Sequence, residues 1–340
     1  MTTAVFDVLD GGPLTTVQDA GRPDWTHLGV PESGAADPWS LAVANLLVGN
    51  AASLAALEIT LVWPSLAVRT ATTIGLAGAD LGARIRGGRP LAPGRSHRLV
   101  VGDILEMPGD GPTAPSTGSR AYVAIPGGVD VPVVLGSRST CLAGGFGGLD
   151  GRALRQGDEI AAASHAAHSI SEAPLRPELV WPAPDSGWLA GGGADRATLR
   201  AVAGPAGGLD QLVTREWRVG SAADRVGVRL DGDRLAEGIG GETTTHGVPW
   251  GAIQVPPDGR PIILGADHQT TGGYRVVGVV ISADLPLLGQ LRPGSVIHIV
   301  ATDRAAALAA LEERRAALVA GAAALRDAAG WGALIDSAGG

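Results

Sequence analysis

The chain of 340 residues contains a single cysteine and no lysine. The lone thiol, Cys141, excludes an internal disulfide framework and a multi-cysteine metal site, which indicates a reducing compartment. Charge is also scarce: charged residues make up 18% of the chain against 45% for hydrophobic ones, as is typical of globular proteins. The formal net charge of -8 argues against a nucleic-acid-binding protein, since phosphate contacts need a basic face.

Segments that would direct the chain to a membrane are also missing. The N-terminus, MTTAVFDVLDGG, lacks the basic head and apolar core of a secretory signal. No run approaches the ~18 consecutive apolar residues that a membrane-spanning helix needs. We therefore expect a soluble, cytoplasmic protein that binds neither a membrane nor nucleic acid.

Several catalytic signatures are absent too. No two histidines have HExxH spacing, so we expect no metal site, and no GxSxG elbow marks a nucleophilic serine. The glycine clusters between residues 125 and 148 have neither the spacing of a P-loop nor the strand-to-helix context of a dinucleotide fingerprint. Arg138 lies between these clusters and has a hydroxyl residue on each side. Its guanidinium group could hold a carboxylate or a phosphate.

Glycine and proline, by contrast, are abundant. The 52 glycines and 23 prolines separate short runs of β-branched residues, which predicts a mainly β protein of the sandwich or barrel type. The expected strands are residues 4–9, 66–73, 97–107, 121–125, 197–203, 251–255, 261–264, 275–282 and 295–300.

Two segments have helical spacing instead. In Pro38–Leu47, Asp37 can cap the N-terminus, and proline suits the first helical position. In Arg304–Ala329, leucines recur on one stripe and Asp303 is a possible cap. We expect this second helix to lie across a domain or to form an intersubunit contact.

A short internal repeat indicates two β-rich units. The segment Leu154–Ile160 (LRQGDEI) resembles Leu291–Ile297 (LRPGSVI), and in each a tight turn leads into a last strand. The chain between the two repeats includes a part rich in alanine, histidine and proline without strand alternation. We expect an N-terminal unit at residues 1–165, a linker at 166–184, a β-barrel unit at 185–303 and a terminal helix at 304–330.

A long polar loop precedes the first helix. Between Asp19 and Asp37 the sequence has almost no apolar pattern, and loops longer than ~12–15 residues in a compact domain are usually functional or disordered. The functional interpretation makes these loop and helix residues line a site: Gln18, Asp19, Arg22, Ser33 and Asn45. In the alternative, Asp19 and Arg22 form a salt bridge within the loop, and Asp37 is only a helix cap.

The stretch of residues 246–286 holds the densest set of polar residues in the chain. Amides such as Gln254 and Gln269 could polarise a carbonyl group, while the carboxylates of Asp224 and Asp267 could act in acid–base chemistry. The same stretch is equally compatible with a hairpin that carries a long polar loop.

Four segments carry a resemblance to a known family. They are VQDAGRPDWTHLGVPESGAADPWSLAVANLLVGN (17–50), IPGGVDVPVVLGSRST (125–140), DRVGVRL (224–230) and HGVPWGAIQVPPDGRPIILGADHQTTGGYRVVGVVISADLP (246–286). Together they resemble the biotin-dependent carboxyltransferase-like family, which contains the C subunit of 5-oxoprolinase, also called allophanate hydrolase subunit 2. The resemblance runs in order from about residue 14 to residue 300.

The resemblance implies a cyclophilin-like β-barrel architecture and an obligate partner, the smaller B subunit of 5-oxoprolinase, which is similar to allophanate hydrolase subunit 1. With that partner and a third protein, the A subunit, it implies ATP-dependent opening of 5-oxoproline to glutamate, so ATP is the expected cofactor. Related sequences form the carboxyltransferase part of urea carboxylase, in which carboxybiotin delivers its carboxyl group to urea. Since this chain has no lysine, biotin would be attached to a separate carrier. A further alternative is a non-catalytic regulatory protein that binds a partner.

The motifs that match the family also imply its site residues. The expected catalytic residues are Asp19, Arg22, Asn45, Asp224, Arg225 and Asp267. The expected substrate-binding residues, to which Arg138 is added, are Gln18, Ser33, Gln254, Gln269, Thr270, Gly272, Gly273 and Tyr274. The chain departs from the family pattern at Ala223, His268 and Arg275, where a serine, an arginine and a proline are common. The lost hydroxyl and guanidinium groups are expected to alter anion binding.

Overall fold

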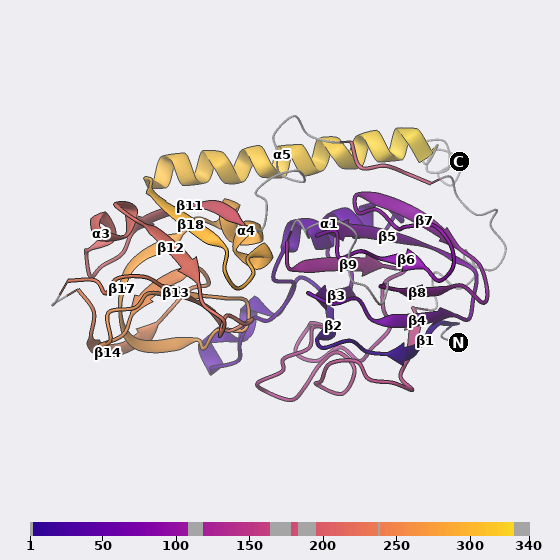
Figure 1. Ribbon diagram of the computed structural model, residues 1–340, viewed down its shortest axis with the longest axis horizontal. Coiled ribbons are helices and arrows are strands. Elements are labelled where there is room, and N and C mark those ends of the chain that lie inside the picture. Colours follow the sequence, from indigo (N-terminus) through magenta and orange to yellow (C-terminus); the bar gives the residue numbers. More distant parts are fainter. Residues whose placement is uncertain (1–2, 108–117, 164–177, 183–194, 237–238, 330–340) are drawn as a thin grey trace. The chain divides into compact units, whose positions relative to one another are not determined.

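The computed structural model describes residues 3–107, 118–163, 178–182, 195–236 and 239–329. They form two compact units, each shown in Figure 1. Unit 1 comprises the described residues of 1–20, 38–189 and 316–340, and unit 2 those of 21–37 and 190–315. The loop of residues 21–37 therefore belongs to the second unit, although it lies near the start of the chain. Most of the expected linker, residues 166–177 and 183–184, falls outside the described residues.

Unit 1 is a pair of five-stranded β-sheets. One has the order β10-β1-β4-β8-β6, and the other has the order β2-β3-β9-β5-β7. The bounds are β1 Thr3–Asp10, β2 Thr15–Gln18, β3 Ala56–Thr60, β4 Ser65–Val68, β5 Thr72–Gly78, β6 Arg84–Ile85, β7 Arg95–Leu99, β8 Ile104–Glu106, β9 Arg120–Ala124 and β10 Glu159–Ala162.

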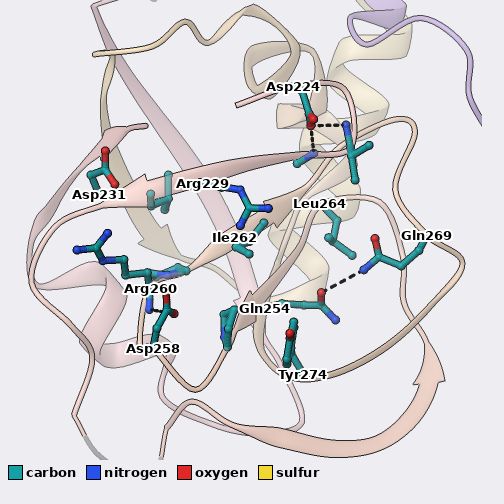
Figure 2. Close-up of a pocket in the computed structure, with 15 residues that line it drawn as sticks. Asp224, Arg229, Asp231, Gln254, Asp258, Arg260, Ile262, Leu264, Gln269 and Tyr274 are labelled. Carbon is teal, nitrogen blue, oxygen red and sulfur yellow. Dashed lines mark hydrogen bonds between the residues drawn. The ribbon is translucent and has the colours of Figure 1, made fainter. Parts of the chain in front are cut away.

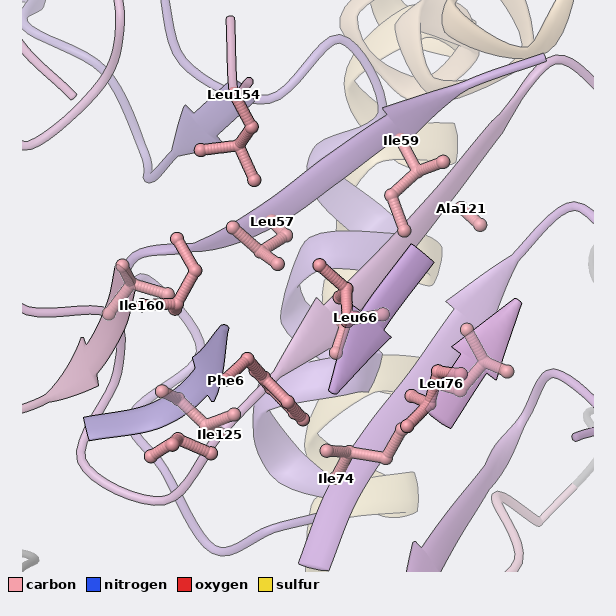
Figure 3. Packing of buried hydrophobic residues seen from close by; sticks show 14 of the residues in the cluster. Phe6, Leu57, Ile59, Leu66, Ile74, Leu76, Ala121, Ile125, Leu154 and Ile160 are labelled. Atoms are coloured by element: carbon pink, nitrogen blue, oxygen red, sulfur yellow. The ribbon is translucent and has the colours of Figure 1, made fainter. Parts of the chain in front are cut away.

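The two sheets of unit 1 share one hydrophobic core. Figure 3 shows Phe6 and Leu66 of the first sheet packed with Leu57, Ile74 and other apolar residues of the second. These residues alternate with outward-facing ones along each strand, as the period of two in a β-strand requires. Helix α1, Pro38–Leu46, packs on β5 and β9 of the second sheet.

Unit 2 is built on a closed β-barrel. The seven strands follow the order β11-β18-β12-β13-β16-β15-β17, and β11 closes the ring because it pairs parallel with β18 and antiparallel with β17. A further strand, β14, pairs with β17. The bounds are β11 Arg196–Ala203, β12 Glu216–Val219, β13 Gly227–Asp231, β14 Glu242–Gly247, β15 Ala252–Val255, β16 Ile262–Leu264, β17 Thr271–Val280 and β18 Val296–Ala301.

Short helices and one long helix complete the described chain. They are η1 Pro23–Leu28, α3 Leu209–Val213, η2 Ser282–Asp284, α4 Leu285–Gln290 and α5 Arg304–Ala329. The apolar interior of the barrel includes the buried side chains of Trp217, Ile253, Ile263 and Val277. The expectation of a mainly β chain with a β-barrel and a C-terminal helix is confirmed.

Several expected elements need correction. The expected strands 66–73 and 97–107 are wrong as single strands, because the first spans the end of β4 and the start of β5, and the second spans β7 and β8. A turn divides the latter, since Val100 N donates to Asp103 Oδ2 at 2.9 Å. The sequence pattern does not predict β14, because ETTTHG has no apolar alternation.

Both predicted helices are present. Helix α1 starts at Pro38 as expected, and α5 has the expected bounds. Asp303 caps α5, because its Oδ1 accepts a hydrogen bond from Ala306 N at 2.8 Å. Residues 304–315 of α5 belong to unit 2 and the following ones to unit 1. Among the described residues, no helix is long and apolar enough to cross a membrane.

The internal repeat corresponds to one turn used twice. In the first copy Asp158 N donates to Arg155 O at 3.2 Å, and Arg155 N donates to Asp158 Oδ2 at 2.9 Å. In the second copy Ser295 and Arg292 make the same two bonds, at 3.0 and 3.2 Å. The intervening glycine has a φ of 89° in one turn and 90° in the other, a conformation that favours glycine. The two turns lead into β10 and β18.

Candidate functional site

A cavity of about 600 Å³ opens on the outer face of the barrel in unit 2. Strands β13, β15, β16 and β17 supply most of its wall (Figure 2). Because side chains alternate along a strand, Ile253 and Val255 point into the barrel core, and Gln254 between them points to the cavity. The lining residues are Asp224, Val226, Gly227, Arg229, Leu230, Asp231, Gln254, Pro256, Asp258, Arg260, Pro261, Ile262, Leu264, Gln269 and Tyr274.

Gln254 is the buried polar group of this cavity. Only 1% of the residue is exposed, yet its Nε2 has no hydrogen-bond partner within the described part of the chain. Among the described residues, its Oε1 accepts one long hydrogen bond, 3.5 Å, from Gln269 Nε2 (Figure 2). A buried donor without a partner costs free energy unless a ligand or water satisfies it. The amide of Gln254 is therefore suited to bind a ligand that offers an acceptor.

The charges around the cavity are mixed. Three carboxylates, those of Asp224, Asp231 and Asp258, line it together with the guanidinium groups of Arg229 and Arg260. Asp224 is held in place because its Oδ1 accepts hydrogen bonds from Val226 N at 2.8 Å and Gly227 N at 3.0 Å. The apolar side chains of Ile262 and Leu264 also line the cavity. Such a cavity can bind a small molecule with both apolar and charged groups.

Arg225 and Asp267, two expected catalytic residues, form a buried ion pair next to this cavity. Arg225 Nε lies 2.7 Å from Asp267 Oδ2 and Nη2 lies 2.9 Å from Asp267 Oδ1, and each side chain is 3% exposed. Arg225 Nη2 also donates to Gly34 O at 2.6 Å. The pair thus fastens the loop of residues 21–37 to the end of the barrel strands.

His268 is buried beside this ion pair. Its Nδ1 lies 2.6 Å from Gln269 O, and because a carbonyl oxygen only accepts, Nδ1 carries the proton of the neutral ring. Burial lowers the pKa of His268, although the bond to Gln269 O and the charges of Glu32 and Asp267 act in the opposite direction. The other ring nitrogen, Nε2, has no partner among the residues that the structure describes.

The predicted loop residues Arg22 and Ser33 are also buried in unit 2. Ser33 has a left-handed backbone conformation, with φ 56°, which is uncommon for a residue other than glycine. Its Oγ makes no hydrogen bond to any described residue. Close by, Gly21 has φ 85°, and a Cβ there would lie 2.9 Å from Glu32 O. This part of the loop is tightly folded.

The remaining expected residues from the first half of the chain lie in unit 1, where each has partners. The carboxylate of Asp19 accepts hydrogen bonds from Ser137 Oγ at 2.6 Å, Ser139 Oγ at 2.5 Å and Arg138 N at 2.6 Å. Asn45 is fully buried, and its Nδ2 donates to Leu54 O at 2.8 Å. These contacts tie the end of β2 to the loop of residues 137–139, and helix α1 to the loop before β3.

Gln18 and Arg138 complete the expected residues of unit 1. Gln18 Nε2 donates to Thr16 Oγ1 at 3.1 Å and to Thr140 O at 3.2 Å. Arg138 Nε donates to Val131 O at 3.0 Å. The contacts of both side chains within their own unit anchor loops.

Four expected site residues line the cavity: Asp224, Gln254, Gln269 and Tyr274. Thr270 lies next to β17, and Gly272 and Gly273 lie within it, so the polar stretch is in part a strand. Sequence reasoning missed Arg229, Asp231 and Arg260. For Arg229 and Asp231 the signal is the alternation of VGVRLD, in which they occupy the outward positions of β13.

No group of His, Cys, Asp and Glu residues in the described ranges could hold a metal ion. The chemistry that the lining residues of the cavity offer is hydrogen bonding from amides and charge pairing with carboxylates or guanidinium groups.

Comparison with known proteins identifies the family. Residues 28–301 match the family described as "Carboxyltransferase domain, subdomain A and B". The chain is 35% identical to the C subunit of the Escherichia coli K12 5-oxoprolinase over 317 residues, which cover 92% of this chain and 96% of that protein. It is 33% identical to the urea amidolyase of Lachancea kluyveri over 87% of this chain, but spans only 17% of that much longer protein.

A solved structure agrees with these matches. The urea carboxylase of Kluyveromyces lactis superposes with a TM-score of 0.81 at 31% identity, over 94% of this chain and 29% of that one. The chain thus belongs to the carboxyltransferase-domain family that includes the C subunit of 5-oxoprolinase and a domain of the urea amidolyases.

Proposed function

We propose that this protein is a subunit of an ATP-dependent 5-oxoprolinase, which opens the cyclic amide 5-oxoproline to glutamate. The observation that carries the proposal is the extent of the match: 96% of the 5-oxoprolinase C subunit is covered, against 17% of the urea amidolyase. Proteins similar to the B and A subunits of 5-oxoprolinase would be its partners. In this complex the chain would bind the amide substrate.

The cavity on the barrel supports this assignment. Gln254 Nε2 offers a hydrogen bond to the lactam oxygen, and the apolar side chains Ile262 and Leu264 suit the ring methylene groups. The carboxylate of 5-oxoproline would pair with Arg229, an exposed residue that lines the cavity next to Ile262 (Figure 2). Orientation of the substrate by such contacts is one general source of catalytic rate.

ATP fits this cavity poorly. A triphosphate needs a surplus of positive groups or backbone donors, whereas here three carboxylates outnumber the two guanidinium groups. We therefore place the amide in the cavity and the nucleotide outside it, with the partner proteins as candidates to supply its site.

The second candidate is the carboxyltransferase component of a urea carboxylase, with carboxybiotin on a separate carrier protein. The observation that favours it is the fold similarity to the urea carboxylase of Kluyveromyces lactis, with a TM-score of 0.81. Urea also presents a carbonyl oxygen to Gln254, but it has no carboxylate for Arg229.

Reconstitution of the chain with its partner proteins tests the two assignments. ADP formation is measured with 5-oxoproline and with urea, with and without a biotinylated carrier together with bicarbonate and a biotin carboxylase, which carboxylates the carrier with ATP. The proposal expects ADP formation that depends on 5-oxoproline and on this chain, and it fails if all three proteins together produce no ADP with that substrate. If activity is seen only with urea and the carrier, and not with 5-oxoproline, the second candidate is favoured. If neither substrate is turned over and the chain instead inhibits a partner enzyme, it is a regulatory protein.

A pair of matched variants tests the place of the substrate. Arg229→Gln is expected to raise the KM for 5-oxoproline about tenfold or more, in line with the loss of a charge-assisted hydrogen bond. Arg218→Gln is the control, because Arg218 lies on the neighbouring strand β12 and donates to Gly294 O outside the cavity. Equal effects of the two variants would contradict the placement of the carboxylate.

A further inference from the structure

We propose that Gln254 selects ligands whose amide N–H and C=O lie on the same edge, as in a lactam, by forming a two-point hydrogen-bonded pair with them. The inference deepens the proposed function and rests on it, since it names the residue and the ligand geometry that define the substrate class of the cavity.

The state of the Gln254 amide is the first observation behind this proposal. Nε2 has no partner among the described residues, and Oε1 has only the 3.5 Å contact with Gln269, at the outer limit of a hydrogen bond. A ligand N–H can replace Gln269 at Oε1 at little cost in free energy, because the bond that it replaces is weak. The ligand oxygen then accepts a hydrogen bond from Nε2. Both polar atoms of a buried side chain are then satisfied at once.

The rigidity of Gln254 is the second observation. Strand β15 pairs with strands on both sides, and Gln254 lies opposite Ile262 on β16 and Val276 on β17. Gly272 leaves just enough space for the amide, because a Cβ at that position would collide with Gln254 Nε2. The backbone of Gln254 is thus held in place before a ligand arrives, and the packing against Gly272 restricts the side chain, which lowers the entropic cost of binding.

The geometry of amides gives the selectivity. A carboxamide presents one donor and one acceptor side by side, and its complement is an amide with the same arrangement. The ring of a lactam forces its N–H and C=O onto one edge, and urea has this edge too. An open-chain secondary amide would have to become cis, at a cost of about 2.5–4 kcal/mol. Gln254 can therefore form the same two hydrogen bonds with 5-oxoproline and with urea, the compounds named by the 5-oxoprolinase and urea carboxylase relatives.

The same geometry distinguishes substrate from product. Hydrolysis breaks the lactam C–N bond, and the carbonyl carbon gains an oxygen from water to become a carboxylate while the nitrogen becomes an ammonium group. The carboxylate has no donor for Gln254 Oε1, so the two-point pair is lost. Ring opening thus lowers the affinity of the cavity for the product.

Binding measurements on the full chain, alone and in complex with its partner proteins, test the proposal. Calorimetric titrations use 5-oxoproline, its N-methyl derivative, the lactone acid in which oxygen replaces the ring N–H, urea, 2-pyrrolidinone and glutamate. We expect 5-oxoproline to bind about 100-fold tighter than the N-methyl and lactone analogues, because a site built to bond an N–H rejects ligands that lack it. Equal affinity for the lactam and the lactone, or no binding of any of the same-edge amides, overturns the proposal.

Variants of Gln254 separate this proposal from the proposed function. Gln254→Met keeps the size of the side chain, and we expect it to abolish the 100-fold preference, because 5-oxoproline loses both hydrogen bonds of the pair whereas the lactone loses only the one to its carbonyl oxygen. Gln211→Met is the matched control, because Gln211 accepts a hydrogen bond from Ala236 N away from the cavity. A Gln254→Met variant that melts normally and keeps the preference overturns the inference. If urea and 2-pyrrolidinone bind through Gln254 but 5-oxoproline is never turned over, the inference stands and the proposed function fails.

Discussion

Asp267→Ala removes the carboxylate that neutralises Arg225 inside unit 2. In the folded protein the two side chains are each 3% exposed and meet at 2.7 and 2.9 Å. After the substitution the guanidinium group keeps its bond to Gly34 O, but its charge stays buried without a counter-charge from residue 267. A buried ion pair stabilises weakly as a whole, whereas the loss of one partner is costly because the desolvated charge remains.

The expected loss of unfolding free energy is about 3–5 kcal/mol. For a unit of this size, about 2–4 °C of melting temperature correspond to each kcal/mol, so the melting temperature of unit 2 should fall by on the order of 10 °C. The loop of residues 21–37, which Arg225 holds at Gly34, should become more accessible to proteases at the same time.

Differential scanning calorimetry measures this change, because it can separate the transitions of two units. The control is Glu216→Ala in the same unit, which breaks the exposed pair of Arg196 and Glu216 and should leave the melting temperature unchanged within error. The sequence resemblance assigns Asp267 a catalytic role, whereas its contacts assign it a structural one. An unchanged melting temperature together with a loss of activity would refute the structural assignment.

Asp19→Ala should destabilise unit 1 by about 2–4 kcal/mol in calorimetry, because three hydrogen-bond donors lose a charged acceptor. A loss of activity at unchanged stability would instead support a catalytic role of Asp19. Gly272→Ala should weaken 5-oxoproline binding at least about tenfold and destabilise the fold by about 1–3 kcal/mol, since the added methyl displaces the Gln254 amide; unchanged binding would contradict the site. Burial lowers the pKa of His268 in the folded state, so the unfolded chain takes up the proton more readily. The stability that His268 contributes is therefore present above its ordinary pKa of 6.5 and is lost as the pH falls below that value. His268→Gln should flatten this part of a plot of melting temperature against pH. An unaltered slope would exclude His268 as the source of the pH dependence.

The sequence by itself determined the class of the protein and its family. Short β-branched runs between glycines and prolines predicted a mainly β chain, and the long motifs of residues 17–50 and 246–286 identified the family. The bounds of α5 and the cap at Asp303 were also local properties, because a helix start depends on residues within one turn.

The tertiary structure alone decided which polar residues share a cavity. Arg229 and Gln254 are distant in the chain and line the same cavity because β13 and β15 both pair with β16. The register of these pairs puts Arg229 and Gln254 each opposite Ile262. Register depends on non-local hydrogen bonds, which the local period of a strand does not specify.

Residues that stand in the same family motifs differ in burial and in their partners once the chain is folded. In the sequence Arg225, Asp267 and Gln254 are all polar and stand in equally distinctive motifs. In the fold, Arg225 and Asp267 neutralise each other, whereas Gln254 has a donor without a described partner, beside a cavity. The physical reason is that the partners of a side chain depend on the strands and loops folded around it, and chain-local patterns do not contain that information.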